Sequence, residues 1–207
     1  MENTIEQSKK SIKLIVWGVV VFVLILVILS VLGKYNSLVT MDEGVNTAWS
    51  QVENQYQRRY DLIPNIVASV KGETNFEKST LEAVVQARAS ATKTTIDVNN
   101  VDEIAEFQKE QTGISQALSK LLMITENYPT LKSNQGFSEL RTELEGTENR
   151  ISTERMRYNE KVQEYNVYIR QFPTNLLASI FGFEKKNLFE NSEKASEVPV
   201  VEFEKMN

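Results

Sequence analysis

Residues 14–33 read LIVWGVVVFVLILVILSVLG, a run of twenty positions without a charged side chain. At a rise of about 1.5 Å per residue, a helix of this length spans the ~30 Å hydrocarbon core of a bilayer. A cleaved signal peptide has a shorter apolar part and a small-residue cleavage site, and no such site follows here. A buried core helix would need more globular mass than the rest of the chain supplies. The stretch therefore predicts an uncleaved single-pass transmembrane helix.

Lysines on either side of this stretch predict its orientation. Lys9, Lys10 and Lys13 precede it, whereas Lys34 is the only basic residue after it before Arg58. Cytoplasmic flanks of membrane helices carry an excess of basic residues. We therefore expect a cytoplasmic N terminus and an exported body.

The composition excludes several classes of chemistry. The 207 residues include no cysteine and no histidine, which excludes disulfides, thiol nucleophiles, imidazole bases and Glu-x-x-His di-iron sites. A formal net charge of −5 argues against a nucleic-acid partner. The sequence also has no Gly-rich phosphate loop and no Gly-x-Ser-x-Gly elbow. We expect no catalytic residue, no cofactor and no metal site.

Few helix breakers are present, and four amphipathic helical patterns follow the apolar stretch. The first opens with capping-box spacing at 40–43 (TMDE) and continues to Val70. Pro64 should kink it, because the carbonyl of Tyr60 loses its helical partner. The second pattern is expected to begin at Ser79, which has capping-box spacing to Glu82.

The third pattern is the most regular. Asn100 has capping-box spacing to Glu103, and a heptad-like 3,4 spacing follows without interruption. Its seam positions are Ile104, Phe107, Gln111, Ile114, Leu118, Leu121, Thr125 and Tyr128. Pro129 should stop this helix, with a loop over 130–136. A fourth helix is expected from 137 to 172, ended by Pro173. The aromatic residues at helical spacing are expected to pack in the core: Trp49, Tyr56, Tyr60, Tyr158, Tyr165 and Phe172.

These patterns predict an all-α fold. It should comprise an N-terminal single transmembrane helix followed by an elongated antiparallel up-down four-helix bundle, because short loops favour antiparallel neighbours. The rest of the chain is more polar than compact domains are, which favours a narrow apolar seam. The expected divisions are a stub (1–13), the transmembrane helix (14–33), the bundle (34–173) and an apolar segment with a flexible tail (174–207).

An ordered series of motifs between about residues 35 and 189 resembles the LemA family. The motifs are 35–39 (YNSLV), 49–65 (WSQVENQYQRRYDLIPN), 128–132 (YPTLK), 143–151 (ELEGTENRI), 157–159 (RYN), 165–166 (YN), 172–173 (FP) and 181–183 (FGF). The resemblance implies a bacterial membrane-anchored protein with an antiparallel helical bundle and no established enzymatic activity. Some relatives carry a lipobox cysteine, which this sequence lacks, and these relatives support an exported body. The transmembrane helix is expected in the bacterial inner membrane. Other members are described with the opposite orientation.

Four seam positions carry a charge or an amide: Arg59, Arg88, Gln111 and Glu154. Antiparallel folding about the expected turns brings all four within roughly one helical turn of each other. We expect a buried or half-buried layer in which Glu154, assisted by Glu148 or Asp61, pairs with both arginines. One interpretation is that this layer fixes the helix register. The alternative is a small-anion or carboxylate ligand held by the two arginines.

The C-terminal segment after Pro173 combines apolar and basic residues. Leu176, Leu177, Ile180, Phe181 and Phe183 precede Lys185 and Lys186. Four antiparallel helices return the chain to the membrane end, so this segment is expected either to contact the membrane or a partner, or to cap the open end of the bundle. From Asn187 onward we expect a flexible tail, with 198–201 as an extended candidate.

Together these features predict a membrane-anchored, non-enzymatic helical scaffold or adaptor. Its expected partners are the lipid bilayer and an unknown membrane or envelope protein, and self-association is compatible with the pattern. A hydrolase using the carboxylates of Glu53, Asp61, Glu143, Glu148 or Glu154 would need a cleft, for which a narrow bundle leaves little room.

Overall fold

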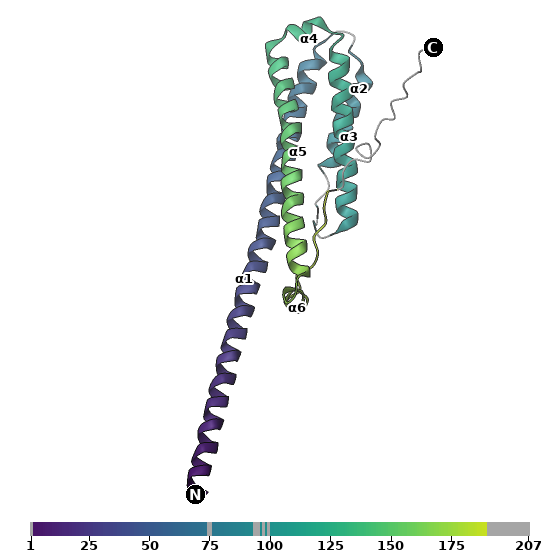
Figure 1. The fold of residues 1–207 in the computed structure, drawn as a ribbon. Coiled ribbons are helices and arrows are strands. Elements are labelled where there is room, and N and C mark those ends of the chain that lie inside the picture. Colours follow the sequence, from purple (N-terminus) through teal and green to yellow (C-terminus); the bar gives the residue numbers. More distant parts are fainter. Residues whose placement is uncertain (1, 74–75, 93–95, 97, 99, 190–207) are drawn as a thin grey trace, which may run out of the picture. The chain divides into compact units, whose positions relative to one another are not determined.

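The computed structural model describes residues 2–73, 76–92, 96, 98 and 100–189, and the all-α prediction is confirmed for them (Figure 1). This described part contains no strand. Its helices are α1 (Glu2–Lys71), α2 (Lys78–Ala91), α3 (Val101–Thr125), α4 (Pro129–Ser133), α5 (Gln135–Arg170) and α6 (Thr174–Phe181).

The chain divides into two compact units, which are described separately. The first unit comprises Met1–Ala48 and Glu160–Lys186, and the second comprises Trp49–Asn159 and Asn187–Asn207. Helices α1 and α5 each contribute residues to both units.

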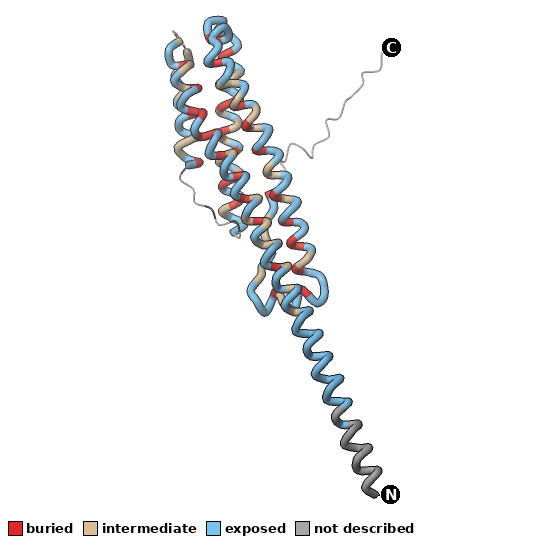
Figure 2. Tube along the Cα trace, turned by 90° about the vertical axis from the view of Figure 1, so that its left-hand side faces the viewer, coloured by how far each residue is buried: buried red, intermediate tan, exposed pale blue. Residues whose placement is uncertain are grey.

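Helix α1 carries the predicted transmembrane stretch. It is long and apolar enough to cross a membrane, and the rest of the described chain buries none of the residues in its most apolar part. The large apolar side chains from Ile15 to Leu29 are 44% to 69% exposed, and this segment is uniformly exposed in Figure 2. Side chains this apolar and this exposed need a nonaqueous surrounding, which a bilayer provides.

The capping box expected at Thr40 does not form. Helix α1 begins at Glu2 and passes through Thr40 without a break. The Thr40 hydroxyl donates to the Asn36 carbonyl at 2.8 Å, as a threonine inside a helix does. No helix starts at Thr40, because the apolar stretch and the first amphipathic pattern form one continuous helix. Residues 40–43 therefore have no free backbone N–H groups to cap.

In the second unit, side-chain contacts establish the directions of the long helices. Trp49 of α1 contacts Tyr158 of α5, while Arg58 of α1 binds Glu143 at the other end of that helix segment, so α1 and α5 are antiparallel. Trp49 also contacts Phe107, which lies near the start of α3. Phe76, just beyond the end of α1, contacts Tyr128, just beyond the end of α3. Helix α3 therefore runs in the same direction as α1, as the up-down prediction requires.

The buried positions of α3 confirm the predicted seam except at Tyr128, which lies beyond the end of the helix and is half-buried. The buried residues are Ile104, Phe107, Gln111, Ile114, Leu118, Leu121 and Thr125. The expected start is also confirmed, because the Asn100 side chain accepts from the Asp102 N–H at 3.1 Å and donates to Glu103 at 2.8 Å.

Two other helix starts differ from the predictions. Helix α2 is preceded by Glu77 rather than Ser79, and the Glu77 carboxylate accepts the hydroxyls of Ser79 and Thr80. The loop expected over 130–136 contains the short helix α4, which begins at Pro129 and buries Leu131. Proline suits the first turn of a helix because its missing N–H has no partner there anyway.

In the first unit, α5 ends at Arg170 and α6 follows after a turn. The expectation that Phe172 lies in the core is wrong: it is 81% exposed, because the chain leaves the helical seam two residues earlier. Helix α6 buries Thr174 and Ala178 and is capped at its C-terminal end by Gly182, whose φ of 75° is the left-handed conformation that glycine favours.

Candidate functional site

A buried arginine lies at the centre of the polar cluster in the second unit. Arg59 of α1 has a side chain only 1% exposed. Its Nη1 donates to Glu148 Oε1 of α5 at 2.8 Å and to Ser115 Oγ of α3 at 2.9 Å, and its Nη2 donates to Gln111 Oε1 of α3. A buried charge is tolerable only when it is paired and hydrogen-bonded, and helices α3 and α5 supply these partners.

The cluster continues from Gln111 to a tyrosine. The Gln111 amide donates to the Tyr60 hydroxyl, and Ser115 Oγ donates to Glu148 Oε2 at 3.3 Å. Burial raises the pKa of Tyr60. The neighbouring Tyr56 ring lies 5.1 Å from Arg59 Cζ, and burial raises the pKa of Tyr56 to about 12. Both phenols therefore stay neutral at physiological pH, and the cluster contains one ion pair.

Arg88 joins the cluster through the backbone. Its Nε donates to the Tyr60 carbonyl at 2.8 Å. That carbonyl would normally accept from the N–H of residue 64, which is Pro64 and has none. The helix continues through Pro64 to Lys71, with a side chain of α2 binding the carbonyl that the proline leaves free.

Glu154 does not pair with the arginines of the cluster, contrary to the expectation. Its carboxylate binds Arg157 Nη1 of the same helix at 2.7 Å, and Arg59 binds Glu148 instead. Glu148 and Glu154 are six residues apart on α5, which corresponds to about 9 Å along the axis and is more than one turn. The prediction was wrong because the position expected for the turn between α3 and α5 set the height of α5 against α3, and so put Glu154 rather than Glu148 beside Gln111. Asp61 is also uninvolved, since it accepts from Gln57.

A small cavity lies beside Tyr60, with a volume of about 200 Å³. It is lined by Glu53, Tyr56, Gln57, Tyr60, Ala91, Thr92, Ile96 and Phe107. Ligand pockets usually measure roughly 300–1,000 Å³, and neither arginine lines this one. Among the described residues, no group of three or more acidic side chains is placed to hold a metal ion. The geometry favours a structural layer over an anion site.

The C-terminal candidate residues lie on and just after α6 in the first unit. Leu176, Ile180 and Phe181 are 55%, 73% and 49% exposed, while Leu177 and Phe183 are half-buried. The rings of Phe181 and Phe183 lie 4.9 and 6.0 Å from the Tyr35 ring of α1. Part of the segment therefore packs on the anchor helix, and part stays open.

The expected flexible tail does not begin at Asn187. In the second unit, Phe189 is buried, its ring stacks on Trp49, and its backbone exchanges two hydrogen bonds with the Asn159 side chain. The Tyr158 hydroxyl donates to the Asn187 carbonyl at 3.0 Å. Residues 190–207, including the extended candidate 198–201, lie outside the described part.

The same arrangement recurs in the first unit. Tyr165 donates to the Glu184 carbonyl, and the Asn166 side chain exchanges two hydrogen bonds with the Lys186 backbone. These two Tyr-Asn pairs, 158–159 and 165–166, bind the segment 184–189, a role that the sequence patterns did not predict for them. Their signal was the repetition of the dipeptide seven residues apart, which puts both pairs on one helix face.

Several known proteins are similar to this chain in sequence. The chain is 26% identical over 193 residues to magnetosome protein MamQ 2 of Paramagnetospirillum magneticum, covering 84% of this chain and 71% of the relative. It is 26% identical over 197 residues to magnetosome protein MamQ of Magnetospirillum gryphiswaldense, covering 86% and 72%. It is 27% identical over 161 residues to protein LemA of Metamycoplasma hominis, covering 78% and 71%. The family model described as LemA family matches residues 48–203, and the chain therefore belongs to the LemA family.

Proposed function

We propose that this protein is a membrane-anchored, non-enzymatic helical scaffold or adaptor of the bacterial cell envelope. The observation that carries the proposal is helix α1, in which an exposed apolar stretch continues without a break into the buried seam of a helical body. A body joined to its anchor by a helix rather than by a loop is suited to presenting surfaces at a membrane.

The use of the body's charged groups supports a role without catalysis. Of the carboxylates considered for acid–base chemistry, Glu143 binds Arg58, Glu148 binds Arg59 and Glu154 binds Arg157. A general acid or base has to reach a substrate proton, and these groups are directed at arginines. The names of the three relatives state no reaction, and two of them assign their proteins to the magnetosome.

The scaffold role can be tested by photo-crosslinking in intact cells. Photoreactive residues at Val85, Met123 and Met156, which are 51% to 66% exposed, sample three helices of the second unit. A scaffold forms discrete adducts, which disappear when residues 2–33 are deleted. Two differently tagged copies would distinguish self-association from a second protein. Absence of discrete adducts at all three positions would contradict the proposal.

The orientation is a separate part of the proposal. The lysine distribution supports a cytoplasmic N terminus and an exported body in the inner membrane. Because the chain has no cysteine, Ser8→Cys and Ser152→Cys would each introduce a unique thiol. An impermeant maleimide should label the exposed position 152 in spheroplasts, and position 8 only after lysis. The reverse pattern would overturn the orientation and leave the anchor intact.

A further inference from the structure

We infer that α6 and the residue before its proline form a membrane-docking foot, which inserts Phe172, Leu176 and Ile180 into the interface of an anionic phospholipid bilayer. The inference rests on the membrane anchoring in the proposed function and goes beyond the scaffold role. Three independent features of the first unit carry it: the exposure of these side chains, their distance from the anchor, and the local charge.

The exposure of the three side chains is unusual. Phe172 and Ile180 are 81% and 73% exposed, more than Trp17 within the transmembrane stretch at 69%. Leu176 and Ile180 lie one helical turn apart on the exposed side of α6, while Thr174 and Ala178 of the opposite side are buried. Phe172 lies in the turn just before the helix and is also exposed. A short helix that is buried on one side and exposes large apolar side chains on the other is suited to a second apolar surrounding.

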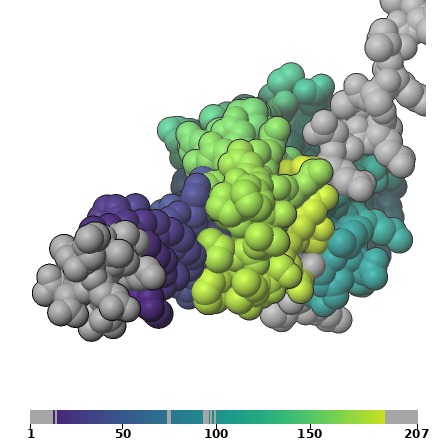
Figure 3. Space-filling view, turned by 60° about the horizontal axis from the view of Figure 1, so that its bottom comes forward, coloured from purple at the N-terminus to yellow at the C-terminus, as the bar shows by residue number. Residues whose placement is uncertain are grey.

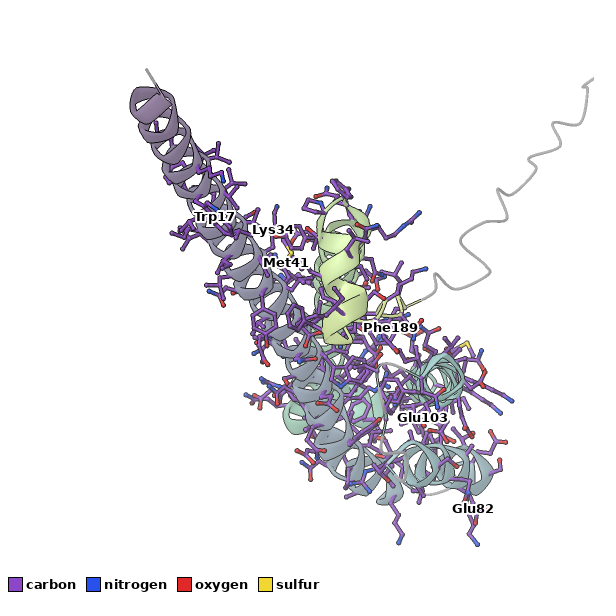
Figure 4. The ribbon with its side chains drawn as sticks, turned by 90° about the horizontal axis from the view of Figure 1, so that it is seen from below. Trp17, Lys34, Met41, Glu82, Glu103 and Phe189 are labelled. Atoms are coloured by element: carbon purple, nitrogen blue, oxygen red, sulfur yellow. The ribbon has the colours of Figure 1, made fainter. Side chains whose placement is uncertain are left out.

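The contacts of α6 place it at the edge of the transmembrane stretch. Tyr35, which contacts Phe181 and Phe183, lies two residues beyond Gly33, or about 3 Å further along the helix axis. Lys34 lies over the Tyr168 ring of α5 at 5.3 Å. Figure 4 shows Lys34 on the side of α1 that faces this part of the unit, and Figure 3 shows α6 next to α1 on the same face. Tyrosine and lysine are typical of the membrane–water interface.

The charge of the segment fits an anionic lipid surface. Residues 170–186 contain three basic residues and one acidic residue, although the whole chain has a net charge of −5. Arg170 and Lys185 are exposed, whereas Lys186 binds Asp42 at 3.0 Å. Basic side chains beside an inserted apolar face strengthen binding to anionic headgroups.

A unique spin label measures the depth of insertion. The full chain carrying Ile180→Cys is labelled with a nitroxide and placed, one chain per disc, in bilayer discs of phosphatidylcholine and phosphatidylglycerol. Relative to a label at Val167→Cys, we expect oxygen to reach the label several-fold more often and a water-soluble nickel complex several-fold less often. Val167 is a matched control, because it is also an exposed apolar side chain of the first unit. It lines a groove with Met41, eight residues beyond Gly33 and about 12 Å along α1.

Each other outcome has a defined meaning. Nickel access at position 180 equal to that at position 167 overturns the inference, as does shielding without a gain in oxygen access, which indicates burial against protein. Shielding found only with two chains per disc identifies a second copy as the occupant. Equal shielding in discs of pure phosphatidylcholine overturns the requirement for anionic lipid. The same measurement with Leu176→Cys is a second test at an independent position, so a folding defect caused by one substitution alone does not decide the result. A chain that leaves the discs contradicts the anchoring itself, whereas a retained chain with an aqueous label contradicts only the foot.

Discussion

Helix α1 contains two regions of opposite character within one continuous helix. From Ile15 to Leu29 the side chains are apolar on every side and exposed, whereas in the later region Val52, Ile63 and Val70 form a buried stripe between exposed polar positions. Helical structure is common to both, so the distribution of apolar residues around the axis decides the surroundings of each region. The later region can also bury a charged side chain. Arg59 is buried there because neighbouring helices supply hydrogen-bond acceptors, whereas a region with apolar side chains on every side has none to offer.

The largest expected effect comes from charging the first region. The double substitution Val21→Arg and Ile25→Arg should abolish retention in the membrane, because each arginine near the bilayer centre costs about 2.5–3.5 kcal/mol. Fractionation followed by carbonate extraction measures it. Val85→Arg, at an exposed apolar position of α2, is the control and should leave the fraction unchanged. Carbonate-resistant retention of the double variant would show that this stretch is not the anchor.

The second effect tests whether the buried arginine of the stripe is paired as described. Arg59→Met keeps the apolar volume but removes the charged donor that binds Glu148 and Gln111, and should lower the free energy of unfolding by about 2–4 kcal/mol. Thermal unfolding in detergent, followed by circular dichroism, measures the change. The adjacent Arg58 is a matched control: it binds Glu143 with both side chains at least 40% exposed, so Arg58→Met should cost less than about 1 kcal/mol. Equal losses in the two variants would contradict the role of burial.

A smaller effect links Arg88 to the proline in the stripe. Arg88→Met should cost about 1–2 kcal/mol, because the part-buried Tyr60 carbonyl then has neither its helical donor nor its side-chain donor. In a Pro64→Ala background the backbone N–H at position 64 can serve that carbonyl, so the same substitution should cost markedly less. A double-mutant cycle in the free energy of unfolding measures the coupling. A coupling of zero would show that the Arg88 bond does not compensate for the proline.

The smallest effect at neutral pH concerns Tyr158, beside Trp49 at the start of the stripe. Tyr158→Phe removes the hydrogen bond to the Asn187 carbonyl and should cost about 1 kcal/mol. Burial raises the pKa of Tyr158 to about 12, so the folded protein holds this proton more tightly than the unfolded chain between pH 10 and 12. Stability should therefore fall in this window by about 1.4 kcal/mol per pH unit from this residue. The variant should flatten that slope, and an unchanged slope would contradict the assignment.

Local patterns predicted those parts of the fold that depend on one segment alone. The seam of α3 and its Asn100 cap were predicted because both follow from spacing within a single helix. The caps at Thr40 and Ser79 were not, since a capping-box spacing also arises by chance inside a helix or one turn from its start. The burial of Phe189 was missed because its partners, Trp49 and Asn159, lie far away in sequence.

The sequence by itself determined the anchor, the all-α class and the membership of Arg59 and Gln111 in a buried seam, because hydrophobicity and periodicity are properties of a continuous stretch. Only the tertiary structure decided that Arg59 binds Glu148 rather than Glu154. It also decided that Arg88 donates to the Tyr60 carbonyl, which Pro64 leaves without a helical donor, and that large apolar side chains of α6 stay exposed. These choices depend on the relative heights of helices joined by turns. A shift of one helical turn, about 5.4 Å, is enough to exchange one partner for another.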